Sequence, residues 1–385
     1  MRGIRTPVAF SLNVEQRALI EEVRRVARAE LAPLVEAAEA GRVNRPLVRA
    51  LGERGLLPRL FPKRAGGTAE RDVSALELCL LREALAQEST EAETALAMQG
   101  LGGSTILRSG SGEVVQRWVP AIARGEAVAA FALTEPNAGT DAAALELKAE
   151  RDGDGYRLTG EKSWISNAPD ADVYALFART TEGARSKGVT AFVLPGDAQG
   201  LTGEPIELIG RHPIGRLRLD GVRVPASDVL GEVDAGFTVA MQTLDLFRPS
   251  VGAFAVGMAQ AALDASVGHA GARKAFGKPL REFQAISQML AEMATRTEAS
   301  RLLVYSAADA YDTGAPTVTR TSAMAKLFAT ETAQWVVDAA VQIHGAAALE
   351  RGHLLEHLYR EVRAPRIYEG TSEIQREIIA RDLYR

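Results

Sequence analysis

The sequence predicts a mostly helical protein with a β domain at its centre, and three observations support this prediction. Apolar residues make up 46% of the composition and aromatic residues only 5%, with Ala and Leu prominent, which favours helices. Helical periodicity marks both ends of the chain, whereas short β-prone segments and turn signals fill the middle. With 385 residues, the chain is long enough for two or three packed units.

Residues 1–125 are expected to form a helical N-terminal domain. Asn13 and Gln16 have the spacing of a capping box, and apolar residues then recur every three or four positions. The same periodicity continues through residues 46–55 and 73–87. These segments predict amphipathic helices that pack together.

Residues 126–232 are expected to form a small antiparallel sheet or barrel. The DGDG stretch at residues 152–155 is typical of a hairpin turn. The predicted strands cover residues 127–133, 145–149, 156–158, 173–178, 190–194 and 217–224.

Residues 233–385 are expected to form a C-terminal bundle of long helices. Apolar residues at helical spacing define the faces that would pack together. One such face comprises Phe283, Ile286, Leu290 and Met293, and another apolar stretch includes Ala325, Leu327, Trp335 and Val336.

Charge and cysteine content argue against several other classes of protein. The net charge is −4 with basic residues scattered, so a nucleic-acid partner is not expected. Cys79 is the single cysteine and lies in an apolar run, which indicates a buried thiol and suits a reducing cytoplasm. The opening MRGIRTPVAFSLN has no continuous apolar core, and no eighteen apolar residues run without charge. We therefore expect a cytoplasmic protein that is neither exported nor membrane-spanning.

Two motifs in the middle domain suggest contacts with a flat, acceptor-rich ligand. The turn Thr134–Asp141 carries hydroxyls and strand-end N–H groups that can face a flavin ring or a pyrophosphate, although a plain turn is the alternative. If Gly160–Ala168 is a strand, Trp164 and Ser166 share one face while Ile165 points into the sheet. An indole beside a hydroxyl suits a redox ring, but a half-buried Trp in a β core is the other interpretation.

Together, TEPNAGTD at residues 134–141 and GEKSWISN at residues 160–167 resemble the flavin-binding sheet of the acyl-CoA dehydrogenases. The order of helical, β and helical segments extends the resemblance over essentially the whole chain. The resemblance implies the family fold with a C-terminal four-helix bundle, FAD as cofactor and an acyl-CoA as substrate. It also implies that FAD is held by Phe131, Leu133, Thr134, Gly139, Thr140, Trp164, Ile165 and Ser166.

A second set of cofactor contacts is implied in the C-terminal domain. From residues alone, the segment Arg273–Leu280 is equally a helix boundary with a solvated Arg273. The resemblance implies that Arg273 pairs with the FAD pyrophosphate of a neighbouring subunit, that Phe276 packs beside it and that Gln284 joins the contact. A guanidinium suits a phosphate well. The oligomer implied is a homotetramer built as a dimer of dimers.

Two further segments carry residues that the resemblance assigns to ligands. Gln342, Gly345 and Ala346 resemble a segment of the neighbouring subunit that touches the dinucleotide, with Ala346 and Ala348 standing where most members have glycine.

Asp245 and Arg248 lie three apart on a predicted helix, a spacing typical of a surface ion pair. The resemblance places both at the substrate, together with Thr140 and Gly370.

The segment IYEGTSEIQ at residues 367–375 matches the C-terminal hallmark of the family. By themselves, Ser372 and Gln375 indicate a capping box and Glu369 a loop carboxylate. The resemblance instead implies that Glu369 is the catalytic base and that Thr371, Ser372 and Glu373 lie along FAD. Some members place the base at the position of Phe247, where phenylalanine cannot serve, so Glu369 is the candidate.

The implied reaction is α,β-dehydrogenation of an acyl-CoA thioester to the trans-2-enoyl-CoA. Glu369 would take the α proton, and the β hydrogen would leave as hydride to flavin N5 near Ser166. Electrons would pass to an electron-transfer flavoprotein in fatty acid β-oxidation.

The alternatives are an acyl-CoA oxidase that uses oxygen, and a flavin-bearing DNA-associated relative with little dehydrogenase activity. A Rossmann dehydrogenase is disfavoured because Gly100–Thr105 lacks the third glycine of GxGxxG. No metal is expected, since His353 and His357 match the HExxH pattern only weakly, with Leu354 in place of its glutamate.

Overall fold

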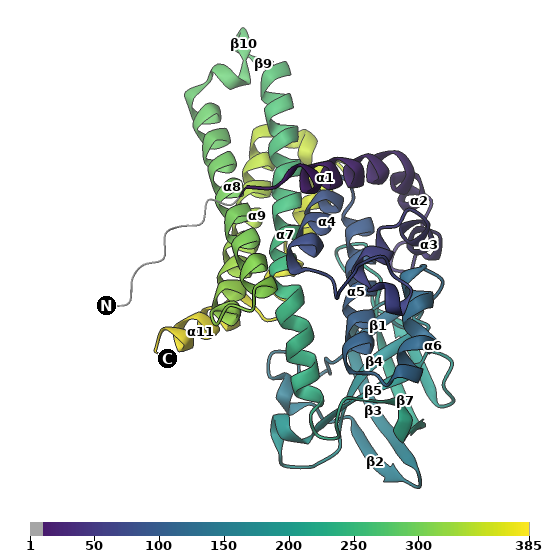
Figure 1. Ribbon diagram of the computed structural model, residues 1–385. Coiled ribbons are helices and arrows are strands. Elements are labelled where there is room, and N and C mark those ends of the chain that lie inside the picture. Colours follow the sequence, from purple (N-terminus) through teal and green to yellow (C-terminus); the bar gives the residue numbers. More distant parts are fainter. Residues whose placement is uncertain (1–10, 385) are drawn as a thin grey trace.

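A computed structural model describes residues 11–384 of the chain. It confirms a mostly helical protein with a central sheet and helical sections on both sides of it in the sequence (Figure 1). Residues 1–10, part of the opening segment considered for export, lie outside the described residues.

The N-terminal section begins at the predicted capping box. The Asn13 side chain accepts a hydrogen bond from the Gln16 backbone N–H at 2.8 Å, and the Gln16 side chain accepts one from the Asn13 N–H at 2.9 Å. The elements that follow are α1 (Val14–Val26), a π turn (Ala27–Leu31), α2 (Ala32–Glu36), α3 (Arg45–Glu53), α4 (Ala75–Glu88), α5 (Thr90–Ser109) and α6 (Gly112–Ala123).

The glycine-rich stretch Gly100–Thr105 is the buried interior of α5 and not a phosphate-binding loop. A Cβ atom added at Gly102 would lie 2.9 Å from the Ala129 Cβ atom and 3.0 Å from the Ala130 backbone nitrogen. The missing side chain therefore lets α5 approach the first strand of the sheet closely.

The central sheet has eight strands in the order β6-β7-β3-β2-β4-β5-β8, with β1 paired to β4. The strands are β1 (Ala129–Ala132), β2 (Lys148–Asp152), β3 (Gly155–Ser166), β4 (Val173–Arg179), β5 (Val189–Pro195), β6 (Leu201–Pro205), β7 (Ile214–Pro225) and β8 (Val229–Leu230). The hairpin predicted at residues 152–155 is confirmed, because Asp152 pairs with Gly155 between β2 and β3.

The expectation of a wholly antiparallel sheet is wrong. β1 runs parallel to β4, and β2 meets β4 in a parallel pair at Lys148 and Arg179. The reason is topological, since the β2–β3 hairpin lies between β1 and β4 in sequence and the chain returns in the direction of β1. The strand β3 is also much longer than the three residues predicted for it.

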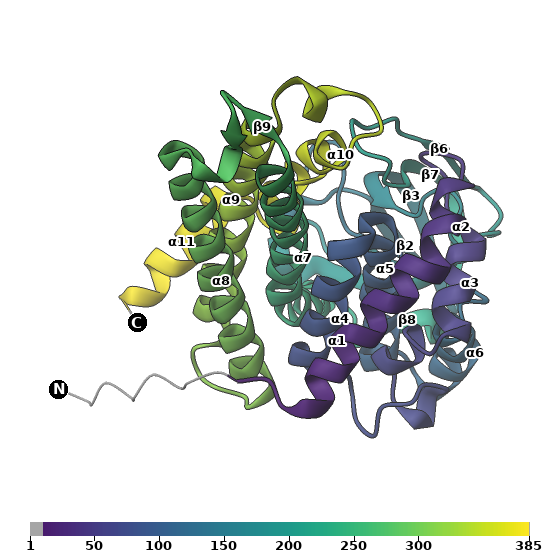
Figure 2. The same cartoon turned by 90° about the horizontal axis from the view of Figure 1, so that it is seen from above.

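The C-terminal section is built on three long helices, α7 (Gly236–Ala272), α8 (Gln284–Asp312) and α9 (Val318–His344). It ends with α10 (Leu354–Glu361) and α11 (Ser372–Leu383). Figure 2 shows α7, α8 and α9 on one side, the sheet on the other, and α1, α4 and α5 between them.

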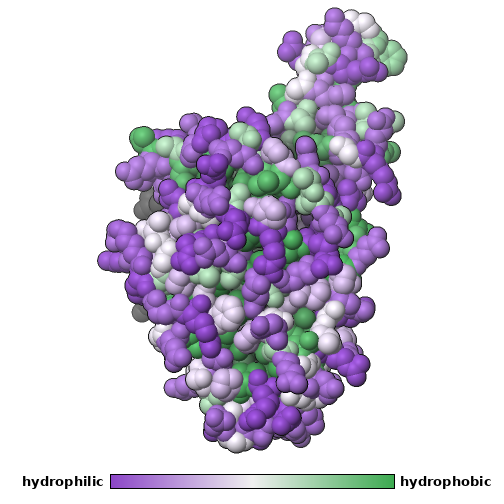
Figure 3. Space-filling view, turned by 90° about the vertical axis from the view of Figure 1, so that its right-hand side faces the viewer, coloured by the Kyte–Doolittle hydropathy of each residue, from purple (hydrophilic) through white to green (hydrophobic). Residues whose placement is uncertain are grey.

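The turn between α7 and α8 is a small hairpin of β9 (Lys274–Ala275) and β10 (Lys278–Pro279). It stands at the end of the molecule opposite β2 in Figure 1, and Figure 3 shows this end as a narrow projection from the body.

The helix α7 is long and apolar enough, by length and composition, to cross a membrane. However, 72% of its most apolar window is buried inside the protein, so its hydrophobicity is explained by its place between α4 and α9. Cys79 on α4 is likewise fully buried, as its apolar neighbours predict, and burial raises the pKa of its thiol.

A Gly102→Ala variant should lose stability, because its added Cβ atom meets the Ala129 side chain and the Ala130 backbone. We expect a loss of about 1–3 kcal/mol, the usual cost of overpacking a close contact, in urea unfolding followed by circular dichroism. Gly112→Ala at the start of α6 is the matched control, since a Cβ atom there meets nothing within 4 Å. Equal stability of the two variants would contradict the close packing of α5 on β1.

Candidate active site

Glu369 lies in the short segment between α10 and α11 and has a left-handed backbone with a φ of 52°. Few residues with side chains adopt this conformation without support, and it is found most often where the surroundings enforce it. Gly370 follows with a φ of 90°. The carboxylate is therefore presented by a tight, unusual turn.

Three consecutive carbonyl groups of this turn are held by two side chains. The Lys326 amino group on α9 donates to the Tyr368 carbonyl at 3.0 Å and to the Gly370 carbonyl at 2.7 Å. The Gln375 amide on α11 donates to the carbonyls of Glu369 at 3.2 Å and Gly370 at 2.9 Å. These bonds stabilise the left-handed turn and attach it to two helices.

The Glu369 carboxylate combines burial with nearby positive charge. Its Oε2 atom is buried and has no hydrogen-bond partner within residues 11–384. Burial raises the pKa of Glu369 above the usual range of a carboxyl group, while Arg82, Lys326 and Arg248 oppose this shift. A carboxylate with a raised pKa and a free oxygen is suited to accept a proton.

Arg82, the cation that opposes this shift most, belongs to a buried network that sequence reasoning missed. Its guanidinium on α4 is 2% exposed, donates through Nε to Glu93 and through Nη1 to the Ser250 hydroxyl at 2.7 Å. A signal was present in the sequence, since Arg82 directly follows the apolar run Leu78–Leu81.

A second group of candidate residues lies at the end of β3. A register shift between Lys162 and Ile165 marks a β-bulge, and Trp164 within it has a φ of 54°. Trp164 is 48% exposed, Ser166 is half-buried and Ile165 is buried. The predicted alternation is therefore present, with indole and hydroxyl on the open side of the strand.

The two motifs of the middle domain are joined by a buried ion pair that sequence reasoning also missed. The Lys162 amino group donates to Glu135 at 2.8 Å and to the Leu133 carbonyl at 2.9 Å. Glu135 in turn accepts hydrogen bonds from the backbone N–H groups of Glu146 and Leu147. The turn Thr134–Asp141 is thus fixed against β3.

The other residues predicted to contact the flavin ring differ in how exposed they are. Phe131 and Thr134 are half-buried, and Gly139 and Thr140 are exposed at the turn. Leu133 is buried, as is Ile165, so these two offer backbone groups and not side chains to a ligand.

The cofactor residues predicted in the C-terminal domain do not lie beside the end of β3 in the same chain. Arg273 and Phe276 lie at the projecting α7–α8 turn, opposite the sheet end of the molecule in Figure 1, with Phe276 95% exposed. Gln284 is exposed at the start of α8.

Gln342, Gly345 and Ala346 lie at the end of α9, on the same side of the molecule as the projecting turn. There the His344 ring stacks on His269 of α7 at 4.1 Å between centroids. Ala346 and Ala348 fall in a 3₁₀ segment and have no positive φ, so their backbone does not require glycine.

Two local expectations need correction. The Asp245–Arg248 ion pair exists at 2.6 Å, but Arg248 is 7% exposed, since α7 is packed on most sides. The cap of α11 is Thr371, whose hydroxyl accepts from the Ile374 N–H, and not Ser372. Ser372 instead donates to Glu331 on α9 at 2.6 Å, because it already lies inside the helix.

The paired histidines considered for metal binding do not share a helix face. His353 caps α10 through its Nδ1 atom, which accepts from the Leu355 N–H at 3.1 Å. His357 lies within α10 and contacts the Thr90 hydroxyl at 2.6 Å.

The exposed Trp164 ring and the neighbouring Ser166 hydroxyl can receive a flat redox ring, and Glu369 offers a buried carboxylate oxygen that no group within residues 11–384 occupies. Comparisons with known proteins specify the family. The chain matches the N-terminal, middle and C-terminal domains of acyl-CoA dehydrogenases over residues 13–126, 130–222 and 234–384. The chain belongs to the acyl-CoA dehydrogenase family and is an oxidoreductase of that family.

Individual relatives match over nearly their whole length. The chain is 36% identical to cyclohexane-1-carbonyl-CoA dehydrogenase of Geobacter metallireducens, covering 97% of this chain and 98% of that protein. It is 36% identical to the caffeyl-CoA reductase-Etf complex subunit CarC of Acetobacterium woodii, covering 95% and 97%. The structure of butyryl-CoA dehydrogenase from Megasphaera elsdenii aligns with a TM-score of 0.93 and 34% identity, covering 98% and 100%.

FAD is the cofactor of this family, and the residues at the end of β3 fit it. Trp164 offers a large exposed aromatic face, and the neighbouring Ser166 hydroxyl can donate or accept a hydrogen bond. Gly139 leaves the turn beside Thr134 open, since a Cβ atom there would meet only the Thr134 methyl group at 3.9 Å.

Changes at the Arg82–Glu93 pair should move the pH dependence of flavin reduction in opposite directions. Arg82→Met combined with Glu93→Gln removes a cation that lowers the pKa of Glu369, so the acidic limb should shift to higher pH. Glu93→Gln alone removes the negative charge that partly offsets Arg82. The pKa of Glu369 should then fall, and the acidic limb should shift to lower pH. Stopped-flow measurement of substrate-dependent flavin bleaching against pH tests both, and an unmoved limb in both variants would show that Glu369 is electrostatically independent of the pair.

Proposed function

We propose that the chain dehydrogenates an acyl-CoA thioester to the trans-2-enoyl-CoA, with Glu369 as the base. The observation that carries this proposal is the buried Glu369 Oε2 atom, which accepts no hydrogen bond from residues 11–384. A carboxylate in this condition can take a weakly acidic α proton, because its raised pKa favours protonation.

The backbone around Glu369 also offers a donor to the substrate. No hydrogen bond within residues 11–384 uses the Glu369 N–H, whereas the carbonyl groups on either side of it are occupied. The free N–H can stabilise the negative charge that develops on the thioester oxygen as the proton leaves. One residue then supplies both the base and an oxyanion donor.

Bound FAD supplies the acceptor for the hydride that leaves the β carbon. Trp164 and Ser166 at the end of β3 are the residues that would hold and orient its ring. Asp245 and Arg248 on α7 and Gly370 and Thr140 are the proposed thioester and CoA contacts.

The electrons are proposed to pass to an electron-transfer flavoprotein. Support comes from the relative CarC, which is named as a subunit of a complex with Etf. The proposed setting is fatty acid β-oxidation in the cytoplasm. Peroxide formed at the rate of flavin reduction in air would instead indicate an acyl-CoA oxidase.

The complete cofactor site is proposed to need a neighbouring subunit within a homotetramer. One chain carries Trp164 and Ser166 at its sheet end and Arg273, Phe276 and Gln284 at the opposite, projecting end (Figure 1). A phenyl ring that is 95% exposed in the isolated chain has strong reason to be covered by another surface. Residues Gln342, Gly345, Ala346, Thr371, Ser372 and Glu373 complete the proposed dinucleotide contacts.

Glu369→Gln should retain bound FAD but bleach on mixing with acyl-CoA several orders of magnitude more slowly, because the amide cannot accept the α proton. Anaerobic stopped-flow absorbance of the flavin measures this. Glu377→Gln on the exposed side of α11 is the charge-matched control and should react like the unmodified protein. Bleaching at the unmodified rate in the Glu369 variant would refute the proposal.

Arg273→Ala should release FAD on dilution, because the phosphate contact from the second subunit is lost while the fold of each chain stays intact. The ratio of flavin to protein absorbance after gel filtration measures retention. Arg281→Ala, also exposed near the projecting turn, should retain FAD. Full retention in both variants would mean that Arg273 takes no part in cofactor binding.

A further inference from the structure

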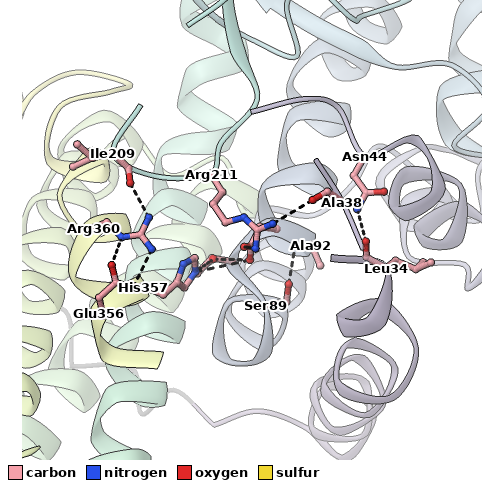
Figure 4. Close-up of polar contacts among 12 residues, drawn as sticks. Leu34, Ala38, Asn44, Ser89, Ala92, Ile209, Arg211, Glu356, His357 and Arg360 are labelled. Atoms are coloured by element: carbon pink, nitrogen blue, oxygen red, sulfur yellow. Dashed lines mark hydrogen bonds and ion pairs between the residues drawn. The ribbon is translucent and has the colours of Figure 1, made fainter. Parts of the chain in front are cut away.

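The loop between β6 and β7, residues 206–213, meets all three sections of the chain. The Arg360 guanidinium on α10 donates to the Ile209 carbonyl at 2.8 Å, and the Arg211 guanidinium reaches the Ala38 carbonyl at 3.4 Å (Figure 4). The loop is closed at its base by a bond from the Ile206 N–H to the Ile214 carbonyl at 2.8 Å. Hydrogen bonds to several parts of the chain thus fix the conformation of the loop.

The loop is also attached to the end of β3, beside Trp164 and Ser166, which together form the proposed flavin platform. The Asn167 N–H donates to the Pro213 carbonyl at 2.9 Å, and the Asn167 side chain donates to the Ala129 carbonyl at 2.8 Å. Between these anchors, the His212 Nε2 atom lies 2.7 Å from the Ser166 hydroxyl oxygen. The histidine is therefore a direct neighbour of the residue proposed to face flavin N5.

The environment of His212 keeps its ring neutral. Burial lowers the pKa of His212 to about 4, because the surroundings penalise the charged form. A small cavity of about 50 Å³, lined by His212, Asn167 and Glu361, lies on this junction between sections. A neutral imidazole has one donor and one acceptor nitrogen, so it can bond to a hydroxyl in either direction.

We propose that His212 is a positioning residue that holds the Ser166 hydroxyl toward the flavin ring and so adjusts the reduction potential of bound FAD. When Nε2 carries the proton, it donates to the Ser166 oxygen and leaves the hydroxyl proton free to point at the ring. When Nε2 is unprotonated, Ser166 donates to it and presents a lone pair to the ring. The pair can therefore complement a ring nitrogen that accepts or one that donates.

The contact is specific because neighbouring side chains of the loop point elsewhere. The Arg211 guanidinium is directed toward Ala38 of the N-terminal section (Figure 4), and it lies 3.9 Å from the Glu91 carboxylate. Ile209 is 67% exposed. Among residues 206–213, His212 is the one whose side chain is hydrogen-bonded to the platform.

A double-mutant cycle on His212 and Ser166 tests the proposal. His212→Phe keeps a planar ring but removes both nitrogens, so the Ser166 hydroxyl loses its partner. We expect the equilibrium constant for two-electron reduction of bound FAD to fall about tenfold, which corresponds to a decrease of about 30 mV in its reduction potential. In a Ser166→Ala background the same His212 change should have no further effect, because the hydroxyl it acts through is absent.

Controls separate this role from loop packing. His212→Gln, whose amide can donate and accept, should restore part of the potential, whereas Arg211→Gln loosens the loop anchor and should leave the potential unchanged. An unchanged potential in His212→Phe, or an equal shift with and without Ser166, would overturn the proposal. If His212→Phe does not fold, ¹⁵N NMR of the His212 ring decides, since Ser166→Ala should alter its tautomer signals only if the contact exists.

The inference rests on FAD binding and not on the proton transfer proposed for Glu369. The cycle can therefore be repeated in the Glu369→Gln background, where potentials remain measurable by dye equilibration. A potential shift there supports the role of His212 even if the base assignment fails, and its absence counts against His212 alone.

Discussion

The buried Lys326 amino group, together with the Gln375 amide, holds the turn on which the proposed chemistry depends. Lys326 binds the carbonyl groups on both sides of Glu369, and these bonds help to keep a non-glycine residue in the left-handed region. Burial lowers the pKa of Lys326 to about 8, opposed first by the charge of Glu369. The lysine thus serves both as a backbone clamp and as part of the positive field at the base.

A second buried lysine fixes the backbone at the proposed cofactor site. Lys162 is fully buried and is bonded to Glu135 and to the Leu133 carbonyl, which joins two sequence motifs that would otherwise be a turn and a strand end. Buried ion pairs contribute little net stability but strongly disfavour arrangements that leave one charge unpaired. In this protein, the Lys162–Glu135 pair and the Lys326 amino group both act on backbone carbonyls next to the proposed ligand contacts.

The division of the proposed cofactor residues between two ends of one chain has a physical consequence. A helical hairpin that projects from the body, as in Figure 3, gains little stability from its own fold at its tip. The exposed Phe276 and Arg273 at that tip are explained if they complete a site on a second copy. Assembly and cofactor binding would then be coupled, since each supplies contacts to the other.

Local features of this protein could be predicted from the sequence because they depend on residues that are close together along the chain. The capping box at Asn13 and the hairpin at Asp152 depend on residues three positions apart, and both are confirmed. The order of helical and β segments followed from periodicity, and the family followed from two short motifs. FAD as cofactor came with that family.

Other features were decided by contacts between distant parts of the chain. The parallel pairing of β1 with β4, the burial of Arg248 and the displacement of the α11 cap to Thr371 all arise from packing that no local pattern reports. Ser166 and His212 are 46 residues apart, and Lys326 and Tyr368 are 42 apart. Periodicity and capping rules act over a few residues, so only the folded arrangement could place these polar partners together.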